Sequence, residues 1–185
     1  MADFRGFIAV DIDCFQSILE FMENLKRVPA RLKIVEPENI HLTLKFLGNT
    51  GEEMLSEIEE IMKEAVKDIS PFTMNVENVG VFPSESYIKV IWIGTENKRE
   101  LISIADRLNE MLQSLGYKRE KREFLPHITV ARVKRTIDKK ILLSLLEEYK
   151  GKHFGELKVD SIKLKKSVLT PSGAVYSTLK EVKLG

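Results

Sequence analysis

The chain has 185 residues, of which 43% are hydrophobic and 31% are charged, and its formal net charge is +1. These proportions are typical of a soluble globular protein and exclude a disordered chain. No apolar run approaches the length of a membrane-spanning helix, and so small a net charge gives no overall field that would identify nucleic acid as a partner.

Length and cysteine content limit the organisation further. A chain of this length fits one domain, which we expect to cover residues 1–185, or two small lobes that share a core. The single Cys14 cannot form an internal disulfide and has no second cysteine with which to hold a structural zinc ion. The N-terminus also lacks the basic and apolar stretches of a secretion signal. We therefore expect a cytoplasmic monomer without a membrane contact.

The first half of the chain alternates predicted strands and helices. Residues 5–12 alternate in polarity and predict a strand, and residues 39–47 predict a second strand that stops at Gly48. Asp13 with Gln16, and Thr50 with Glu53, have the spacing of capping boxes, which place a helix after each strand. Apolar side chains at helical spacing support both helices: Ile18, Leu19, Met22 and Leu25 in the first, and Leu55, Ile58, Ile61, Met62, Ala65 and Val66 in the second.

The second half continues in the same way. Residues 72–80 and 87–93 predict two strands joined by a turn at Pro83 and Ser84. A third helix covers residues 101–115 and ends at Gly116, because glycine is favoured after the last turn of a helix. A strand follows at residues 126–131, and Asp138 is then in a position to cap a fourth helix. Strands at residues 157–165 and 175–182 complete the predicted elements.

Two of the predicted strands carry the same three-residue pattern. The segments His41-Leu-Thr43 and His127-Ile-Thr129 lie 86 residues apart in a chain with three histidines in all. Side chains alternate between the faces of a strand, so each histidine shares a face with its threonine while the residue between them points to the core. Two such strands facing one cleft would present two imidazoles and two hydroxyls to a small anionic group. That combination suits acid–base chemistry on a phosphate.

The order of the elements indicates an internal duplication. A predicted helix with a capping residue follows each strand that carries the His-x-Thr pattern, and a strand-rich segment follows each helix. We therefore expect an α+β fold of two pseudo-symmetric lobes, each with an antiparallel sheet flanked by helices. A pseudo-twofold axis between the lobes would bring the two motif strands together, so that they line a central cleft.

Basic residues gather around the second motif. Between residues 118 and 140 there are nine lysines and arginines against three acidic residues. Such a run is either a solvated surface or a positively charged approach for a phosphate backbone, and we give both interpretations equal weight. Arg132 lies close to the motif and is a candidate phosphate ligand, although a regular strand would point it away from His127 unless a bulge or the strand end re-aims it. Lys45 shares the strand face of His41 and is expected at the edge of the cleft.

The residues around both motifs resemble the paired signatures of the 2H phosphoesterase superfamily. The segments concerned are residues 41–48 (HLTLKFLG) and residues 124–132 (FLPHITVAR). Within the superfamily they are most similar to the RNA 2′,3′-cyclic phosphodiesterase branch, which is also called 2′-5′ RNA ligase. The opening strand at residues 5–10 and the closing segment at residues 167–176 resemble the same branch. The similarity therefore covers nearly the whole chain.

The resemblance implies a bilobal fold that hydrolyses a terminal 2′,3′-cyclic phosphate of RNA to a 2′-phosphate, with neither a metal ion nor a cofactor. It also implies the joining of tRNA halves by a 2′-5′ bond. It assigns His127 as the base that activates water and His41 as the acid for the departing 3′ oxygen, although the residues alone allow the reverse. Thr43, Thr129 and Arg132 would bind the phosphate oxygens.

Three alternatives use the same residues. A divalent ion could bind the two motif histidines, but neither motif carries an Asp or Glu, and the third histidine, His153, lies in a Lys/Gly-rich stretch where we expect a surface position. The substrate could instead be a small cyclic nucleotide or cyclic ADP-ribose phosphate. The fold could also serve as a non-catalytic RNA- or nucleotide-binding module. Substituted motif residues would favour that last alternative, and all four are intact here.

Overall fold

The computed structural model describes residues 3–96, 98–136, 138–171 and 173–185. Met1, Ala2 and Ser172, which belong to the N-terminal and closing segments considered above, lie outside the described residues. The strands are β1 (Asp3–Asp11), β2 (Ala30–Ile34), β3 (His41–Gly51), β4 (Phe72–Ser84), β5 (Tyr87–Glu96), β6 (His127–Thr136), β7 (His153–Val159), β8 (Ser161–Thr170) and β9 (Gly173–Lys183). The helices are α1 (Gln16–Arg27), α2 (Leu55–Val66), α3 (Arg99–Met111) and α4 (Lys139–Tyr149), with short 3-10 helices at η1 (Pro37–Asn39), η2 (Glu52–Met54) and η3 (Leu112–Leu115).

These strands form one antiparallel sheet. Its order is β7-β4-β5-β6-β3-β1-β8-β9, and β2 pairs with β6 outside this path. The two strands that carry the His-x-Thr pattern, β3 and β6, meet in the middle, where Leu42 lies opposite Ile128. The predicted α+β fold with two related halves is confirmed. The structure adds that the two halves share a single continuous sheet.

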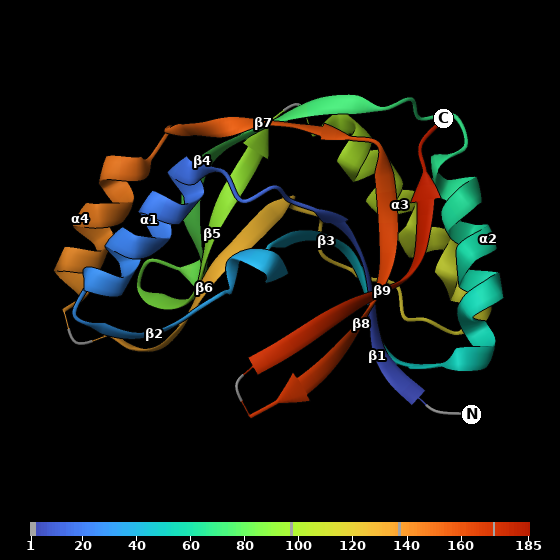
Figure 1. Ribbon diagram of the computed structural model, residues 1–185, viewed down its shortest axis with the longest axis horizontal. Coiled ribbons are helices and arrows are strands. Elements are labelled where there is room, and N and C mark those ends of the chain that lie inside the picture. The colour runs from blue at the N-terminus through green and yellow to red at the C-terminus, as the bar shows by residue number, and fades with distance from the viewer. Residues whose placement is uncertain (1–2, 97, 137, 172) are drawn as a thin grey trace.

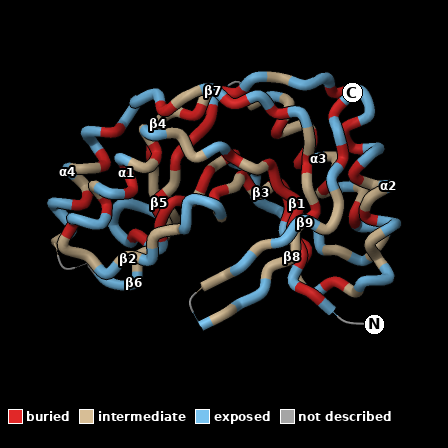
Figure 2. The backbone as a smooth tube through the Cα atoms, viewed as in Figure 1, coloured by how far each residue is buried: buried red, intermediate tan, exposed pale blue. Residues whose placement is uncertain are grey.

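The helices lie on the outer flanks of the molecule with the sheet between them (Figure 1). Helices α2 and α3 pack on the half that contains β3 and β9, whereas α1 and α4 pack on the half that contains β2, β4 and β7. Buried residues follow the helix faces and strands that meet between them (Figure 2), and they include Phe21, Met62, Leu42 and Ile128. We call the opposite side of the sheet, which these helices leave uncovered, the open face. Among the described residues, no helix is both long and apolar enough to cross a membrane.

The sequence predicts four helix-capping features: two capping boxes, an N-cap at Asp138 and a C-terminal glycine at Gly116. Two of these four are present in the structure. The Asp138 carboxylate accepts hydrogen bonds from the backbone N–H groups of Lys140 and Ile141 and so caps α4. Gly116 ends the α3–η3 segment in the left-handed region, with a φ of +84°. Both capping boxes are wrong. Phe15 is the N-cap of α1 without a side-chain hydrogen bond, and Thr50 belongs to β3, where its hydroxyl donates to the Gly48 carbonyl.

The turn predicted at Pro83 and Ser84 is wrong, because both residues belong to β4 and the turn lies at Glu85 and Ser86. Three further strand predictions differ from the structure. The five-residue β2 was not predicted, because it is too short to show a clear alternation. The predicted strand at residues 157–165 is two strands, β7 and β8, which separate at Asp160. Strand β3 continues through Gly48 to Gly51, because Gly48 adopts a φ of +75° where the register between β1 and β3 shifts. The strand therefore bends at this glycine and continues.

Candidate active site

The four motif side chains lie together on the open face, where β3 and β6 meet. Leu42 and Ile128 are opposite one another and fully buried, so the residues on either side of them point to the open face. The antiparallel register then places each histidine opposite the threonine of the other motif: His41 opposite Thr129, and His127 opposite Thr43. The structure thus brings together the four residues that the sequence predicts from two distant segments.

The two histidines are diagonal neighbours in this arrangement. Side chains directly opposite in an antiparallel pair start about 5 Å apart, and diagonal neighbours start roughly 7–8 Å apart. A spacing of this size admits one tetrahedral phosphate between the rings of His41 and His127. In-line displacement at phosphorus needs one proton-transferring group on each side of the phosphate, and a diagonal pair of imidazoles could meet this need.

Both imidazole rings are oriented by the same kind of hydrogen bond. Nδ1 of His41 lies 2.7 Å from the Asn39 carbonyl oxygen, and Nδ1 of His127 lies 2.7 Å from the Leu125 carbonyl oxygen. A carbonyl oxygen only accepts hydrogen bonds, so in each ring Nδ1 carries the hydrogen. Nε2 is left as the nitrogen that can take or give a proton on the open face. Each of the two carbonyls precedes its histidine by two residues, so the duplicated halves orient their rings in the same way.

The environment favours neutral imidazoles. Burial lowers the pKa of His41 and of His127 below the ordinary value of 6.5, although the carbonyl bonded to each ring opposes this change. The positive charge of Arg132 lowers the pKa of both rings further. Lys165 also lowers the pKa of His41, whereas the carboxylate of Asp11 raises it. The two rings therefore differ, because His41 has a carboxylate and a second cation nearby.

Aromatic side chains surround both rings, and sequence reasoning missed them. The centroid of the His41 ring is 4.9 Å from that of Phe7 and 5.1 Å from that of Tyr176. The His127 ring is 5.0 Å from Phe82 in an edge-on contact and 6.4 Å from Trp92. Phe7, Phe82, Trp92 and Tyr176 come from four different strands, β1, β4, β5 and β9.

A local signal for one of these aromatics was present. Trp92 lies between Ile91 and Ile93, which are both fully buried, so alternation places its ring on the open face. The ring spreads over Gly80 of β4, where an added Cβ would come within 2.2 Å of Trp92 Cζ2. Gly80 is therefore required for the position of Trp92. The pairing of β4 with β5 cannot be read from either residue alone.

Matching bulges follow both motifs. Leu44 and Lys45 of β3 are both buried, as are Val130 and Ala131 of β6, and the register with the neighbouring strand shifts at each place. Each bulge turns the fifth residue after the histidine to the open face: Phe46 in β3 and Arg132 in β6. The bulge that Arg132 required is therefore present. Its position also accounts for the effect of Arg132 on both histidines.

The bulge in β3 takes Lys45 away from the open face, so the prediction that Lys45 lies at the cleft edge is wrong. The residue is only 3% exposed, and its Nζ donates to Asn109 Oδ1 at 2.6 Å and to the Lys118 carbonyl at 2.7 Å. Burial lowers the pKa of Lys45, although the charge of Glu120 opposes this. Lys45 therefore connects β3 with α3 and the following loop on the helix-covered face.

The basic segment at residues 118–140 is divided between the two faces of the sheet. The Lys118 carbonyl is bound by Lys45, and Arg119 lies 3.5 Å from Glu110 of α3. This part of the segment packs against α3. Arg132, in contrast, lies on the open face beside the motifs. Lys118 and Arg119 therefore lie on the helix-covered side, unlike Arg132.

His153 is remote from the two motif histidines. It begins β7, the first strand in the sheet order, where its side chain is 50% exposed and its Nδ1 lies 3.6 Å from Glu77 Oε2. The predicted surface position is confirmed. Across the part of the chain that the structure describes, no group of three or more His, Cys, Asp or Glu side chains is arranged to hold a metal ion.

Comparison with known families agrees with this geometry. Residues 12–184 match the family model described as the AKAP7 2′5′ RNA ligase-like domain. The chain belongs to this family. The match confirms the resemblance that the two His-x-Thr segments indicate. It covers both His-x-Thr strands and both halves of the sheet except β1 (Asp3–Asp11), so it includes the four motif residues and Arg132 but not Phe7.

Relatives of this family member match over almost their full lengths. The RNA 2′,3′-cyclic phosphodiesterase of Methanocaldococcus jannaschii is 42% identical over 179 residues, which cover 96% of this chain and 99% of the relative. The protein of the same name from Methanothermobacter thermautotrophicus is 35% identical over 182 residues, 97% and 98% of the two chains. A crystal structure of a Thermus thermophilus protein aligns with a TM-score of 0.80 and 26% identity, over 97% of both chains. The apo structure of E. coli LigT has the same fold, with a TM-score of 0.70, 24% identity and coverage of 100% of this chain and 99% of that chain.

Proposed function

We propose that this protein hydrolyses the 2′,3′-cyclic phosphate at the end of an RNA and leaves a 2′-phosphate. The observation that carries the proposal is the diagonal pair of histidines at the centre of the sheet, each with Nδ1 bound to a carbonyl and Nε2 left for proton transfer. The curated relatives with the name RNA 2′,3′-cyclic phosphodiesterase support the choice of substrate.

Hydrolysis needs two proton transfers at one phosphorus. Nε2 of His127 takes a proton from water as the water oxygen bonds to phosphorus. The bond from phosphorus to the 3′ oxygen breaks, and Nε2 of His41 gives its proton to that oxygen. The product has a free 3′-hydroxyl and a 2′-phosphate, and the protons return to their starting distribution through solvent. The charges near His41 do not select the acid by themselves, because Lys165 lowers the pKa of this ring by more than the Asp11 carboxylate raises it. The assignment of roles follows the resemblance to the family.

Three side chains are positioned to stabilise the negative charge that develops on the phosphate. The hydroxyls of Thr43 and Thr129 face the same space as the imidazoles and can donate hydrogen bonds to the non-bridging oxygens. Arg132, turned to the open face by its bulge, adds a guanidinium charge. Donors that are held in place before the reaction stabilise the transition state without reorganisation.

The same site can join RNA ends. If a 5′-hydroxyl takes the place of water, His127 removes its proton and the new bond links the 2′ and 5′ oxygens through phosphorus. The 3′ oxygen leaves with the proton of His41, as in hydrolysis. No energy source beyond the strained cyclic phosphate is required for this step, and tRNA halves are substrates of the required kind. We include this 2′-5′ ligation in the proposal as a second outcome of one mechanism.

A feature of the open face supports an RNA end over a free cyclic phosphate. Phe46 is 65% exposed and its ring centroid lies 6.4 Å from that of Phe7, which in turn contacts His41. An exposed aromatic ring beside the reacting group offers a surface on which a nucleobase stacks. The substrate is then held both by its phosphate and by a neighbouring base.

The deciding experiment uses a short RNA that ends in a 2′,3′-cyclic phosphate. Purified protein is incubated with this RNA, and the products are resolved against 2′-phosphate and 3′-phosphate standards. The 2′-phosphate is the expected product. A 3′-phosphate would show that the 2′ oxygen leaves instead, and absence of turnover would redirect the test to small cyclic nucleotides and then to a binding role.

Chelation of divalent metal ions is expected to leave this activity intact. The mechanism uses imidazole protons in place of a metal-bound water, so kcat/KM with EDTA should stay within about twofold of the untreated value. The measurement compares initial rates before and after EDTA, and after added magnesium, manganese or zinc. A loss that a divalent ion reverses would establish a metal requirement and refute this part of the proposal.

The pH dependence of kcat/KM is expected to have its maximum below pH 6.5. The reaction needs one protonated and one neutral imidazole in the free enzyme, and burial lowers the pKa of both His41 and His127 below the ordinary value of 6.5. As pH rises above the higher of the two lowered values, the acid loses its proton and kcat/KM falls. As pH drops below the lower value, the base becomes protonated. A profile that continues to rise to about pH 8 would contradict this assignment.

A further inference from the structure

The two halves of the site differ in where they carry positive charge. In the half that contains β6, the bulge presents Arg132 on the open face. In the half that contains β3, the equivalent position is Phe46, which has no charge. A phosphate between the two histidines therefore has a cation from β6 but none from the corresponding position of β3.

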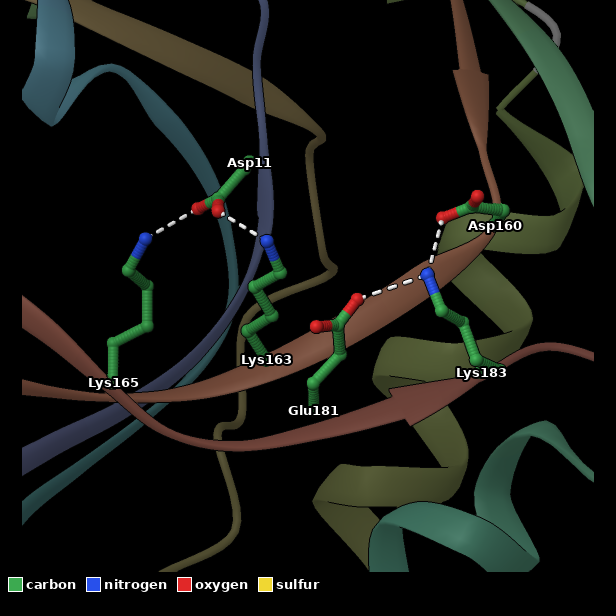
Figure 3. Close-up of polar contacts among 6 residues, drawn as sticks. All are labelled: Asp11, Asp160, Lys163, Lys165, Glu181 and Lys183. Atoms are coloured by element: carbon green, nitrogen blue, oxygen red, sulfur yellow. Dashed lines mark hydrogen bonds and ion pairs between the residues drawn. The ribbon is translucent and has the colours of Figure 1, made fainter.

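Strand β8 supplies a cation on the side that lacks one. Lys165 lies opposite Phe7 in the register of β8 and β1, and its Nζ donates to the carboxylate of Asp11. Asp11 is itself directly opposite His41 in the register of β1 and β3. Lys165 and His41 therefore both neighbour Asp11, and the ammonium of Lys165 is close enough to His41 for its charge to lower the pKa of that ring. Figure 3 shows Asp11 between the amino groups of Lys165 and Lys163.

The chemistry of this group fits an anion. The side chain of Lys165 is 12% exposed, and an ammonium has three N–H donors, of which the hydrogen bond to Asp11 uses one. Asp11 also accepts a hydrogen bond from Lys163 at 2.7 Å. Burial raises the pKa of Asp11, but the hydrogen bonds and charges of the two lysines outweigh this and lower it overall. One carboxylate and two ammonium groups leave one unit of positive charge in this cluster.

We propose that Lys165 is a substrate-binding residue whose ammonium contacts a non-bridging oxygen of the reacting phosphate on the His41 side, and that Asp11 is a positioning residue that holds this ammonium in place. The proposal rests on the proposed function and adds a second cation to it. Arg132 and Lys165 then flank the phosphate from the two halves of the sheet.

Lys163 provides a matched control. It lies on the same strand and also binds Asp11, but it is 24% exposed and has the charge of Glu181 as a second acidic neighbour. Glu181 in turn pairs with Lys183, which also pairs with Asp160 (Figure 3). Either lysine can be replaced while the other still neutralises Asp11. A purely structural role for the ion pairs would therefore make the two replacements equivalent.

The test compares Lys165→Met with Lys163→Met in two assays. In the first, kcat/KM for RNA with a 2′,3′-cyclic phosphate should fall about 10- to 100-fold for Lys165→Met, because a charged hydrogen bond to the phosphate is lost. Lys163→Met should stay within about threefold of wild type. Lys165→Arg should recover part of the lost activity, since it restores the charge. Thermal unfolding of each variant shows whether the fold is retained.

The second assay measures binding without turnover. The Kd for RNA with a 2′-phosphate end is determined at several salt concentrations. Removal of one phosphate contact reduces the slope of log K against log salt by about 0.7, and this is expected for Lys165→Met. A general disturbance of the fold would not reduce this slope for Lys165→Met while leaving the slope of Lys163→Met unchanged. Equal behaviour of the Lys165 and Lys163 variants in both assays would overturn the proposal and leave the proposed function standing.

The role of Asp11 has its own readout. Asp11→Asn keeps the size of the side chain but removes the charge that holds Lys165, so kcat should fall about tenfold while KM does not rise, because the site becomes more positive. An unchanged kcat would refute the positioning role. If wild type binds the 2′-phosphate RNA in a Lys165-dependent way without hydrolysing the cyclic phosphate, the proposed function fails and Lys165 remains a phosphate-binding residue without a role in hydrolysis. If wild type neither binds nor hydrolyses, both are refuted.

Discussion

Replacement of His41 or His127 by alanine is expected to lower kcat about 10²- to 10⁴-fold in each case, because each change removes one of the two proton-transferring groups. The two rings occupy diagonal positions on one strand pair with Nε2 directed to the open face, so neither can substitute for the other. Turnover of RNA with a 2′,3′-cyclic phosphate end is measured for both variants under single-turnover conditions. The double variant should lose far less than the product of the two single effects, since the residues act as a unit.

His153→Ala is the matched control for these variants. It removes the remaining histidine of the chain, which lies half-exposed on β7 beside Glu77. Its kcat should equal that of wild type. Full turnover by His41→Ala and His127→Ala, with the fold retained in circular dichroism, would show that the assignment of acid and base is wrong. Loss of activity in the His153 variant would point to a structural cause for all three effects.

Arg132→Met is expected to lower kcat/KM about 10²- to 10³-fold, which is the usual effect of removing one group that stabilises charge in a transition state. Arg132 faces the open side after the bulge at Val130 and lowers the pKa of both histidines, so it is close to the proposed position of the phosphate. Arg132→Lys should retain an intermediate rate, because an ammonium keeps the charge but not the planar pair of donors.

Arg135→Met is a suitable comparison for this effect. Arg135 is an exposed arginine of the same strand, paired with Arg31 of β2. Its replacement removes the same charge three residues further along β6 and should change kcat/KM by less than about threefold. Equal losses for the two arginine variants would mean that general positive charge, and not a contact made by Arg132, accounts for the effect.

The two halves of the sheet share the same backbone geometry around the motif but carry different side chains at the position that the bulge exposes. Each half has a strand that starts with His-x-Thr, a carbonyl two residues before the histidine that orients the ring, and a bulge after the threonine. At the residue that each bulge exposes, one half carries Phe46 and the other Arg132. In the proposed function, these equal backbones with different side chains let one half stack a nucleobase while the other binds the phosphate charge.

Local signals in the sequence were reliable where one short segment settles the outcome. Asp138 caps α4 because its carboxylate needs only the N–H groups of the next turn, and Gly116 ends a helix because it tolerates a positive φ. The Thr50–Glu53 capping box failed although its spacing is correct, since β3 continues through Thr50 to pair with β1. Tertiary pairing outweighed a local preference worth about 1 kcal/mol.

What the sequence by itself determined is which side chains share a face in each motif strand. Alternation of period two is a property of the strand alone, so His41 and Thr43, like His127 and Thr129, had to point away from the core. Only the tertiary structure decided that Leu42 lies opposite Ile128, that aromatic rings from four strands enclose the imidazoles, and that Lys45 is buried while Arg132 is not. The physical reason is that one extra residue at a bulge reverses every later side chain, and such a bulge forms only against the partner strand.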